Sequence, residues 1–179
     1  MAERISMLSW VTPDLQVESV LDLTVDRIRS LNLDGLLLDL DCTLKDYHEQ
    51  QCSAAVHQWI ETLSTNGILL CILSNAKYAR LKPLAESLGL PFVPKAFKPL
   101  PFGCQAGVRK LQLGSRRTAM VGDQLFADVM AGRLAGLFTI LVRPTSDEEP
   151  WFTRIKRPLE RQVLNRINGT SRHGFETTQ

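Results

Sequence analysis

The chain has 179 residues, of which 44% are hydrophobic and 22% are charged, and its net charge is +2. These proportions are typical of a folded globular domain, so they exclude a largely disordered, collagen-like or coiled-coil chain. The length suits one domain, and a net charge this small gives no reason to expect nucleic acid as a partner.

Residues 1–32 are predicted to form an arm that packs on the rest of the domain. Val17, Val20 and Leu21 are its scattered apolar residues, and Thr24 can cap a short helix that follows. No signal peptide is visible, and the apolar runs of the chain are far shorter than the roughly 18 residues that cross a membrane. We therefore expect a protein that is not secreted and that works on the cytoplasmic or organelle-stromal side, free or as a peripheral membrane protein.

Residues 33–145 alternate short apolar runs with segments of helical periodicity. Strands are predicted at 36–38, 68–73, 118–121 and 138–142, with a weaker strand at 90–93. Helices are predicted between them, near 56–63, 81–88, 101–113 and 125–135. This alternation predicts an α/β domain, with a three-layer Rossmann-like core around a mostly parallel five-stranded sheet.

Residues 146–167 are predicted to form a loop and then a basic amphipathic helix, and residues 168–179 are predicted to be disordered. From Trp151 onward, six basic residues face two acidic ones, which gives this region a net charge of +4. The helix either packs its apolar face on the sheet or, through residues 151–167, lies on an anionic membrane, and the sequence leaves both readings open. The apolar face consists of Leu159, Val163 and Ile167.

The four cysteines have no spacing typical of a metal site or a disulfide framework. We expect them to be buried free thiols. They are Cys42, Cys52, Cys71 and Cys104.

Polar residues follow three of the predicted strands. Asp39 comes directly after the first strand, Ser74 after the second and Asp123 after the strand that ends at Val121. Ligands of parallel sheets bind at the carboxyl ends of the strands, so these side chains are expected to share one site.

The segment Asp39-Leu40-Asp41-Cys42-Thr43 carries two carboxylates with separable chemical roles. Asp39 can attack a phosphorus atom to form an aspartyl phosphate, and Asp41 can protonate the leaving oxygen and then activate water. A carboxylate repels a phosphate, so the reaction needs a cation such as Mg²⁺.

Other residues can complete such a phosphate site. Asp123 can ligate Mg²⁺, Asp128 can support the metal shell, and Lys98 can supply a positive charge. The phosphate oxygens can accept hydrogen bonds from a further set of residues. This set comprises Thr43, Ser74 and Asn75, together with Lys98.

These residues form four motifs, which are the Asp39–Thr43 segment, Ser74, Lys98 and the pair Asp123 and Asp128. The motifs occur in the order found in the haloacid dehalogenase superfamily of aspartate-nucleophile phosphatases, which the sequence resembles. The resemblance implies that Asp39 is the nucleophile and Asp41 the general acid and base. It also implies that Mg²⁺ is held by the Asp39 carboxylate, the Asp41 carbonyl and Asp123.

Residues 10–167 resemble the YqeG family within subfamily IIIA of that superfamily. This family is similar to the mitochondrial and plastid phosphatidylglycerophosphate phosphatases, so the resemblance implies phosphatidylglycerophosphate as the substrate. The sequence departs from the usual pattern at three positions, which leaves substrate preference open. These positions are Cys42, Ala76 and Ala127.

The spacing of the motifs leaves no room for a cap domain over the site. Asp41 and Ser74 are separated by a loop and one predicted helix, and Ser74 and Lys98 by one helix and a weak strand. An open site suits a phosphorylated lipid or another bulky phosphomonoester that itself excludes water. A phosphoprotein or nucleotide phosphatase, or a weakly catalytic binding or assembly protein on the same fold, are the alternatives.

Overall fold

A computed structural model describes residues 7–145 and 162–165 of the chain. The strands are β1 Leu15–Val17, β2 Gly35–Leu38, β3 Leu69–Leu73, β4 Phe92–Val93, β5 Thr118–Gly122 and β6 Phe138–Val142. The α-helices are α1 Val25–Ser30, α2 Ala54–Thr65, α3 Tyr78–Ser87, α4 Phe102–Leu111 and α5 Met130–Leu134. Short 3-10 turns cover Met7–Trp10, Val20–Asp22 and Ser115–Arg117, and a π-helical turn covers Leu125–Val129.

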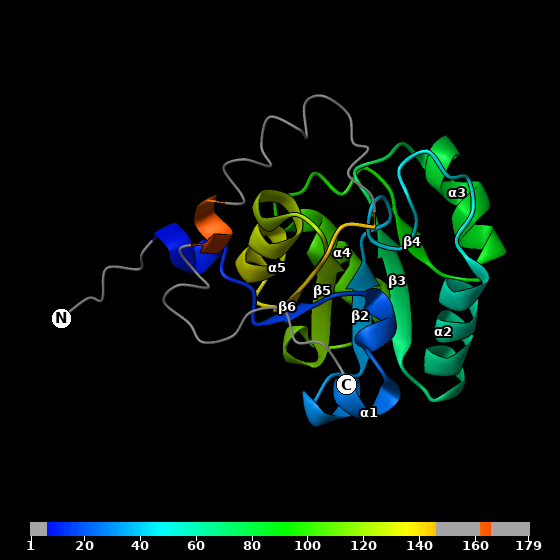
Figure 1. Cartoon of the computed structure of the whole chain (residues 1–179), viewed down its shortest axis with the longest axis horizontal. Coiled ribbons are helices and arrows are strands. Elements are labelled where there is room, and N and C mark those ends of the chain that lie inside the picture. The colour runs from blue at the N-terminus through cyan, green and yellow to red at the C-terminus, as the bar shows by residue number, and fades with distance from the viewer. Residues whose placement is uncertain (1–6, 146–161, 166–179) are drawn as a thin grey trace.

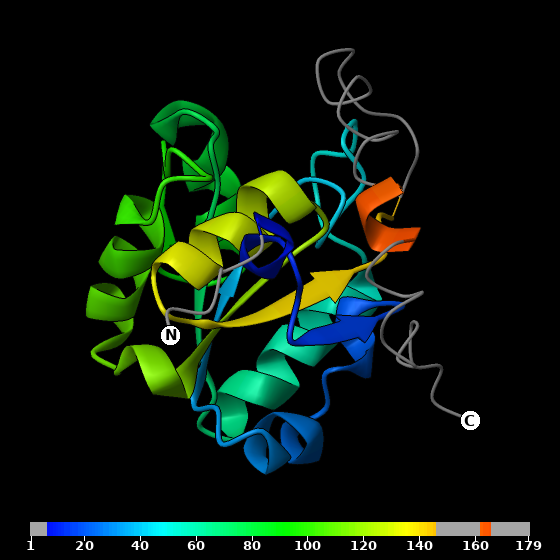
Figure 2. The ribbon, with the colours of Figure 1, turned by 90° about the vertical axis from the view of Figure 1, so that its left-hand side faces the viewer.

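All strand pairs in the sheet are parallel, and the strand order is β1-β6-β5-β2-β3-β4 (Figure 1). Helices lie on both sides of the sheet, which makes the three layers (Figure 2). This confirms the predicted Rossmann-like α/β architecture with its parallel sheet.

The alternating side chains of the central strands divide the core between the two faces. Leu36 and Leu38 of β2 belong to a cluster with α1, α2 and α3, whereas Leu37 belongs to a cluster with α4 and α5. Successive residues of a strand point to opposite faces, so a strand that is buried on both sides reads as a continuous apolar run. All four residues of β2 are buried, as that reading requires.

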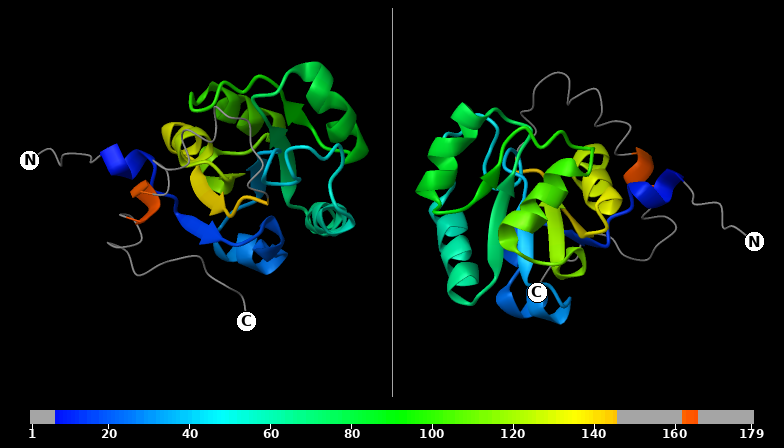
Figure 3. Two further views of the ribbon diagram at one scale, coloured as in Figure 1. Left: turned by 45° about the horizontal axis from the view of Figure 1, so that its top comes forward. Right: turned by 180° about the vertical axis from the view of Figure 1, so that it is seen from behind.

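The prediction of five strands was wrong, because part of the N-terminal arm forms a sixth. β1 pairs with β6, beside which it lies in Figure 3 (left). Asp14 holds it there by accepting hydrogen bonds from the backbone and the hydroxyl of Thr139, at 2.8 and 2.9 Å. A three-residue strand shows no periodicity, so this contact across 125 residues has no local signal.

Of the predicted C-terminal elements, the loop, most of the basic helix and the tail of 168–179 lie outside the described residues. Residues 162–165 are helical, and Val163 and Leu164 pack against a cluster formed by Val11, Leu125, Val129 and Leu141. Within 7–145 and 162–165, no helix combines the length and the apolar character needed to cross a membrane.

Candidate active site

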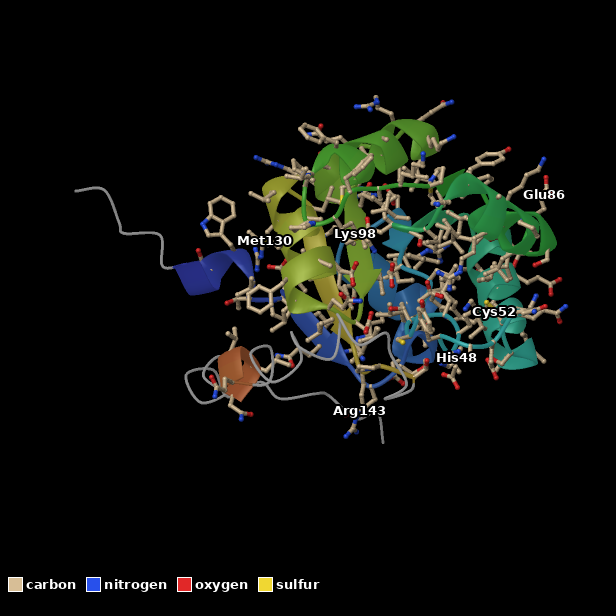
Figure 4. The ribbon with its side chains drawn as sticks, turned by 90° about the horizontal axis from the view of Figure 1, so that it is seen from above. His48, Cys52, Glu86, Lys98, Met130 and Arg143 are labelled. Carbon is tan, nitrogen blue, oxygen red and sulfur yellow. The ribbon has the colours of Figure 1, made fainter. Side chains whose placement is uncertain are left out.

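The candidate site lies at the carboxyl edge of the three central strands, which Figure 4 views from above. Asp123 follows β5, Asp39 follows β2 and Ser74 follows β3, and these strands are neighbours in the sheet. The chain runs from β2 outward to β3 and β4 and then returns to β5 on the other side of β2. Asp39 and Asp123 therefore flank the point at which the strand order reverses, where ligands of such sheets bind.

Three buried carboxylates meet one buried lysine at this edge. Oxygen atoms of Asp39, Asp123 and Asp128 lie within 4.8 Å of one another, and each side chain belongs to a residue that is at most 7% exposed. The Lys98 Nζ contacts Asp39 Oδ1, donates to Asp128 Oδ1 at 2.6 Å and also donates to the Leu73 carbonyl at 3.3 Å. The structure thus brings four of the predicted site residues together.

Asp128 reaches the cluster because Gly122 leaves room for it. A Cβ atom at Gly122 would lie 2.3 Å from the Asp128 Cγ, which is impossibly close. The other oxygen of Asp128 accepts a hydrogen bond from the backbone N–H of Gln124 at 3.1 Å. Asp128 lies within the π-helical turn, whose wider winding is often found at functional sites.

Burial and neighbouring charges change the acidity of this cluster. Loss of solvation raises the pKa of Asp39 to about 7, with Lys98 opposing the rise and Asp128 adding to it. Burial works against the charged form of Lys98, but Asp128 and Asp39 outweigh it and raise the lysine pKa above its ordinary value. Lys98 therefore stays positively charged, and Asp39 gains a proton more readily than an exposed aspartate.

The cluster fits a hard divalent cation. Three carboxylates and one ammonium leave an excess of negative charge in a buried site, and carboxylate oxygens are the ligands that such cations prefer. Asp39 and Asp123 match the predicted ligand set, and Asp128 lies close enough to support the metal shell. Asp41 contributes no carboxylate to this cluster, and the ligand role that the resemblance implies for its backbone carbonyl stays a prediction.

Thr43 and Ser74 are both buried at this edge. The Thr43 hydroxyl lies 3.3 Å from Asp123 Oδ1 and 3.5 Å from Asp39 Oδ2, so it can donate to one of them at a time. The Ser74 Oγ accepts a hydrogen bond from the backbone N–H of Ala76 at 3.1 Å, which leaves its O–H free to donate elsewhere. The Thr43 hydroxyl thus contacts the cluster, and the Ser74 hydroxyl is buried at the same edge of the sheet.

The Asn75 side chain is committed to the backbone of Lys98. Its Oδ1 accepts from the Lys98 N–H at 2.9 Å, and its Nδ2 donates to the Lys98 carbonyl at 3.2 Å. The paired bonds hold the loop that aims Lys98 into the site. In this arrangement Asn75 positions the lysine, a role different from the phosphate contact that the sequence predicts.

Asp41 lies apart from the acidic cluster, in an ion-pair network that the sequence analysis missed. Its Oδ1 accepts hydrogen bonds from Lys45 Nζ and from Arg80 Nη2, both at 2.9 Å. The Arg80 guanidinium also lies over the Tyr47 ring, 5.3 Å from its centre. Lys45 lies four residues after Asp41, and this spacing is a weak sequence signal for an ion pair. Arg80 lies on α3, 39 residues from Asp41, and no sequence pattern connects the two.

A cavity of about 650 Å³ adjoins this network. Lys45 and Arg80 supply positive charge to its wall, and Leu40 and Leu84 supply apolar surface. The remaining lining comes from the loop before α2 and from α3, namely Tyr47, His48, Glu49, Gln50 and Pro83. The cavity thus lies beside the two residues that hold the Asp41 carboxylate.

The sequence is similar to those of known hydrolases and phosphatases. A family model described as a haloacid dehalogenase-like hydrolase matches residues 18–136. The probable phosphatase YqeG of Bacillus subtilis (strain 168) is 33% identical over 155 residues, which is 87% of this chain and 90% of that protein.

Solved structures share the fold at low sequence identity. The 3-deoxy-D-manno-octulosonate 8-phosphate phosphatase of Moraxella catarrhalis has a TM-score of 0.54 at 17% identity, over 82% of this chain and 97% of that one. The cobalt-bound deoxy-D-mannose-octulosonate 8-phosphate phosphatase of Haemophilus influenzae has a TM-score of 0.53 at 16% identity, over 77% and 91%. The predicted superfamily is confirmed: the chain belongs to the haloacid dehalogenase-like hydrolases and is a phosphatase of that family.

Proposed function

We propose that this protein is a Mg²⁺-dependent phosphomonoester hydrolase that forms an aspartyl phosphate on Asp39, with phosphatidylglycerophosphate as its substrate. The observation that carries the proposal is the separation of the two motif carboxylates. Asp39 lies in the buried cluster with Lys98, whereas Asp41 lies outside this cluster, held by Lys45 and Arg80. Two carboxylates in such different surroundings can act as nucleophile and as proton carrier.

The proposed reaction has two steps, and Asp39 and Asp41 have a defined role in each. An oxygen of Asp39 attacks the phosphorus atom while the bond from phosphorus to the alcohol oxygen breaks and Asp41 protonates that oxygen. Asp41 then takes a proton from water as the water attacks the same phosphorus atom, which releases phosphate and restores Asp39. Lys98, Thr43 and Ser74 would stabilise the negative charge on the phosphoryl oxygens.

Asp39, Asp123 and the Asp41 carbonyl would hold Mg²⁺, with Asp128 beside them. The ion would reduce the repulsion between carboxylate and phosphate and polarise the phosphoryl oxygens.

Two features support a bulky lipid phosphate as substrate. Between Asp41 and Lys98 the chain forms a loop, α2, β3, α3 and β4, so these segments contain no cap domain to enclose a small molecule. In phosphatidylglycerophosphate a glycerol and a second, diester phosphate follow the leaving oxygen. The cavity beside Asp41, with Lys45 and Arg80 in its wall, offers such a group both space and positive charge.

Contact of residues 151–167 with an anionic membrane remains a prediction, because most of this segment lies outside the described residues. Val163 and Leu164 pack on the Val11 cluster. For that one turn, this contact supports the alternative, in which the helix packs its apolar face on the rest of the domain.

The proposal is tested by measuring phosphate release from lipid, nucleotide, sugar and phosphopeptide substrates, with Mg²⁺ and with EDTA. We expect Mg²⁺-dependent turnover that is highest on phosphatidylglycerophosphate and absent in the Asp39→Asn variant. Turnover of another substrate class alone would refute the lipid assignment and keep the phosphatase. Failure to hydrolyse any substrate would favour a binding or assembly role on this fold.

A further inference from the structure

Among the residues that the structure describes, the four most exposed large hydrophobic side chains lie at the active-site end of the molecule. Tyr78 is 53% exposed, Phe97 63%, Leu100 49% and Phe102 62%, and these four residues are called the apolar rim below. The other exposed large hydrophobic residues of the described chain reach at most 42%. Large apolar side chains exposed at one end of a molecule are a common feature of surfaces that bind a partner.

Backbone hydrogen bonds join the two segments that carry the apolar rim. The N–H of Lys95 donates to the carbonyl of Ala76 at 2.9 Å, and the N–H of Ala96 donates to the carbonyl of Ser74 at 3.0 Å. Leu100 closes a turn by donating to the Phe97 carbonyl at 2.9 Å. The start of α3 and the loop before α4 therefore lie side by side at this end of the molecule.

The same loop sends Lys98 into the active site. The Lys98 side chain is only 3% exposed and contacts Asp39 and Asp128, although its neighbour Phe97 is the most exposed large hydrophobic residue. In the view of Figure 4, onto the carboxyl edge of the sheet, Lys98 lies near the middle of the molecule. A surface that contacts the apolar rim would thus face the reacting phosphate.

Three lysines lie at the surface around the rim, namely Lys77, Lys82 and Lys95. Of the other basic residues of 74–102, Lys98 is buried against Asp39 and Asp128, and Arg80 pairs with Asp41. Glu86, which meets Lys82, is the one acidic residue of this segment. Lys77 and Lys95 are exposed and directly precede Tyr78 and the Phe97 loop, and Lys82 lies 5.8 Å from the Tyr78 ring. Aromatic and aliphatic side chains among lysines match the interface of an anionic bilayer, where rings enter the headgroup layer and ammonium groups meet phosphates.

We propose that the apolar rim is a membrane-contact surface that docks the active site onto an anionic lipid bilayer. The inference rests on the proposed lipid phosphatase function, because it explains how the open site reaches a phosphate in the headgroup layer. It places membrane contact at the mouth of the site, independently of residues 151–167.

The test compares vesicle binding of the full-length protein with that of Phe97→Ser/Phe102→Ser. The vesicles are phosphatidylcholine alone or with about 30 mol% phosphatidylglycerol, an anionic fraction large enough to attract lysines. Leu69→Ser/Leu134→Ser is the matched control, because both leucines are exposed near the opposite edge of the sheet, where β3 begins and α5 ends. Thermal unfolding checks that each variant is folded.

We expect the natural protein to bind vesicles that contain phosphatidylglycerol and to bind pure phosphatidylcholine at least about tenfold more weakly. The rim variant should lose at least about tenfold in affinity for the anionic vesicles, because two aromatic side chains no longer enter the interface. The control variant should stay within about twofold of the natural protein, as expected for substitutions outside the contact surface. Equal binding by the rim variant, or binding independent of phosphatidylglycerol, would overturn the proposal.

Activity measurements separate this inference from the proposed function. Hydrolysis of phosphatidylglycerophosphate in vesicles should fall with binding in the rim variant, whereas hydrolysis of a soluble short-chain form should be unchanged. If the rim variant and the control variant lose activity equally on the vesicle substrate and on the soluble substrate, the rim has no special role at the membrane. If no substrate is hydrolysed but vesicle binding depends on the rim, the surface stands and the proposed function fails.

Discussion

At the scale of single residues, Asp39 has a proposed catalytic role and a position that lowers the stability of the folded protein. Its carboxylate lies in a buried cluster with two other aspartates, and only one lysine balances their charge among the residues that meet there. Burial raises its pKa to about 7, which means that the folded protein holds the ionised form at a cost in free energy. A bound cation would offset this cost.

Replacing Asp39 by Asn should therefore stabilise the metal-free protein at neutral pH. A carboxyl whose pKa is raised by folding supports the fold fully below its unfolded pKa, and this support is lost as the pH rises through the folded value, here from about 4 to about 7. The free energy of unfolding of the natural protein should fall across this window relative to that of Asp39→Asn, by an amount on the order of a few kcal/mol. Urea unfolding in EDTA at both ends of the window measures the difference, and parallel pH profiles would contradict it.

At the scale of elements, helix α3 does more than cover the sheet. Leu81, Leu84 and Ala85 bury one face of the helix in the core, while Arg80 on another face reaches the Asp41 carboxylate. The helix starts at Tyr78, shortly after β3, so the packing of its apolar face sets the position of Arg80. Core packing and the orientation of Asp41 are thereby linked.

Arg80→Gln should lower kcat/KM by about tenfold or less. Exposed ion pairs contribute roughly 0–1 kcal/mol, 1.4 kcal/mol corresponds to tenfold in rate, and the Lys45 hydrogen bond still holds Asp41. Lys82→Gln removes a charge from the same helix, but Lys82 meets Glu86 and the Tyr78 ring and not Asp41, so the activity of this variant on a soluble substrate should equal that of the natural protein. Equal losses in both variants would indicate a general effect of charge instead of an effect on Asp41.

At the scale of the whole molecule, the core buries all four cysteines. Each is a free, buried thiol, as the sequence analysis predicted. Loss of solvation raises the thiol pKa of Cys52 to about 11 and those of Cys71 and Cys104 to about 12. The reactive thiolate is thus scarce at neutral pH in the folded state.

Thiol labelling should consequently report on unfolding. With a chromogenic disulfide reagent at about pH 8, we expect slow labelling of the folded protein and rapid labelling of four thiols in denaturant, because reaction requires opening of the core. The labelling rate should rise with urea in parallel with the loss of secondary structure. A thiol that reacts within seconds in the folded protein would show that the core around it opens far more readily than the rest.

Much of the active site follows from the sequence, because its signals are local. Asp39, Ser74 and Asp123 each come directly after an apolar run, and parallel strands bring such positions to one edge. Lys98 and Asp128 were predicted to join them, and the structure places both in the cluster. The strands themselves were readable because burial on both faces produces unbroken apolar runs.

By itself, then, the sequence determined the α/β class, the parallel sheet and the residues that meet at its carboxyl edge, since periodicity and motif order act over a few residues. Only the tertiary structure decided that residues 15–17 form a sixth strand, that Asn75 clamps the backbone of Lys98, and that Arg80 holds Asp41. Each of these depends on packing between segments 23 to 125 residues apart, and the free energy of such contacts leaves no periodic pattern in either segment.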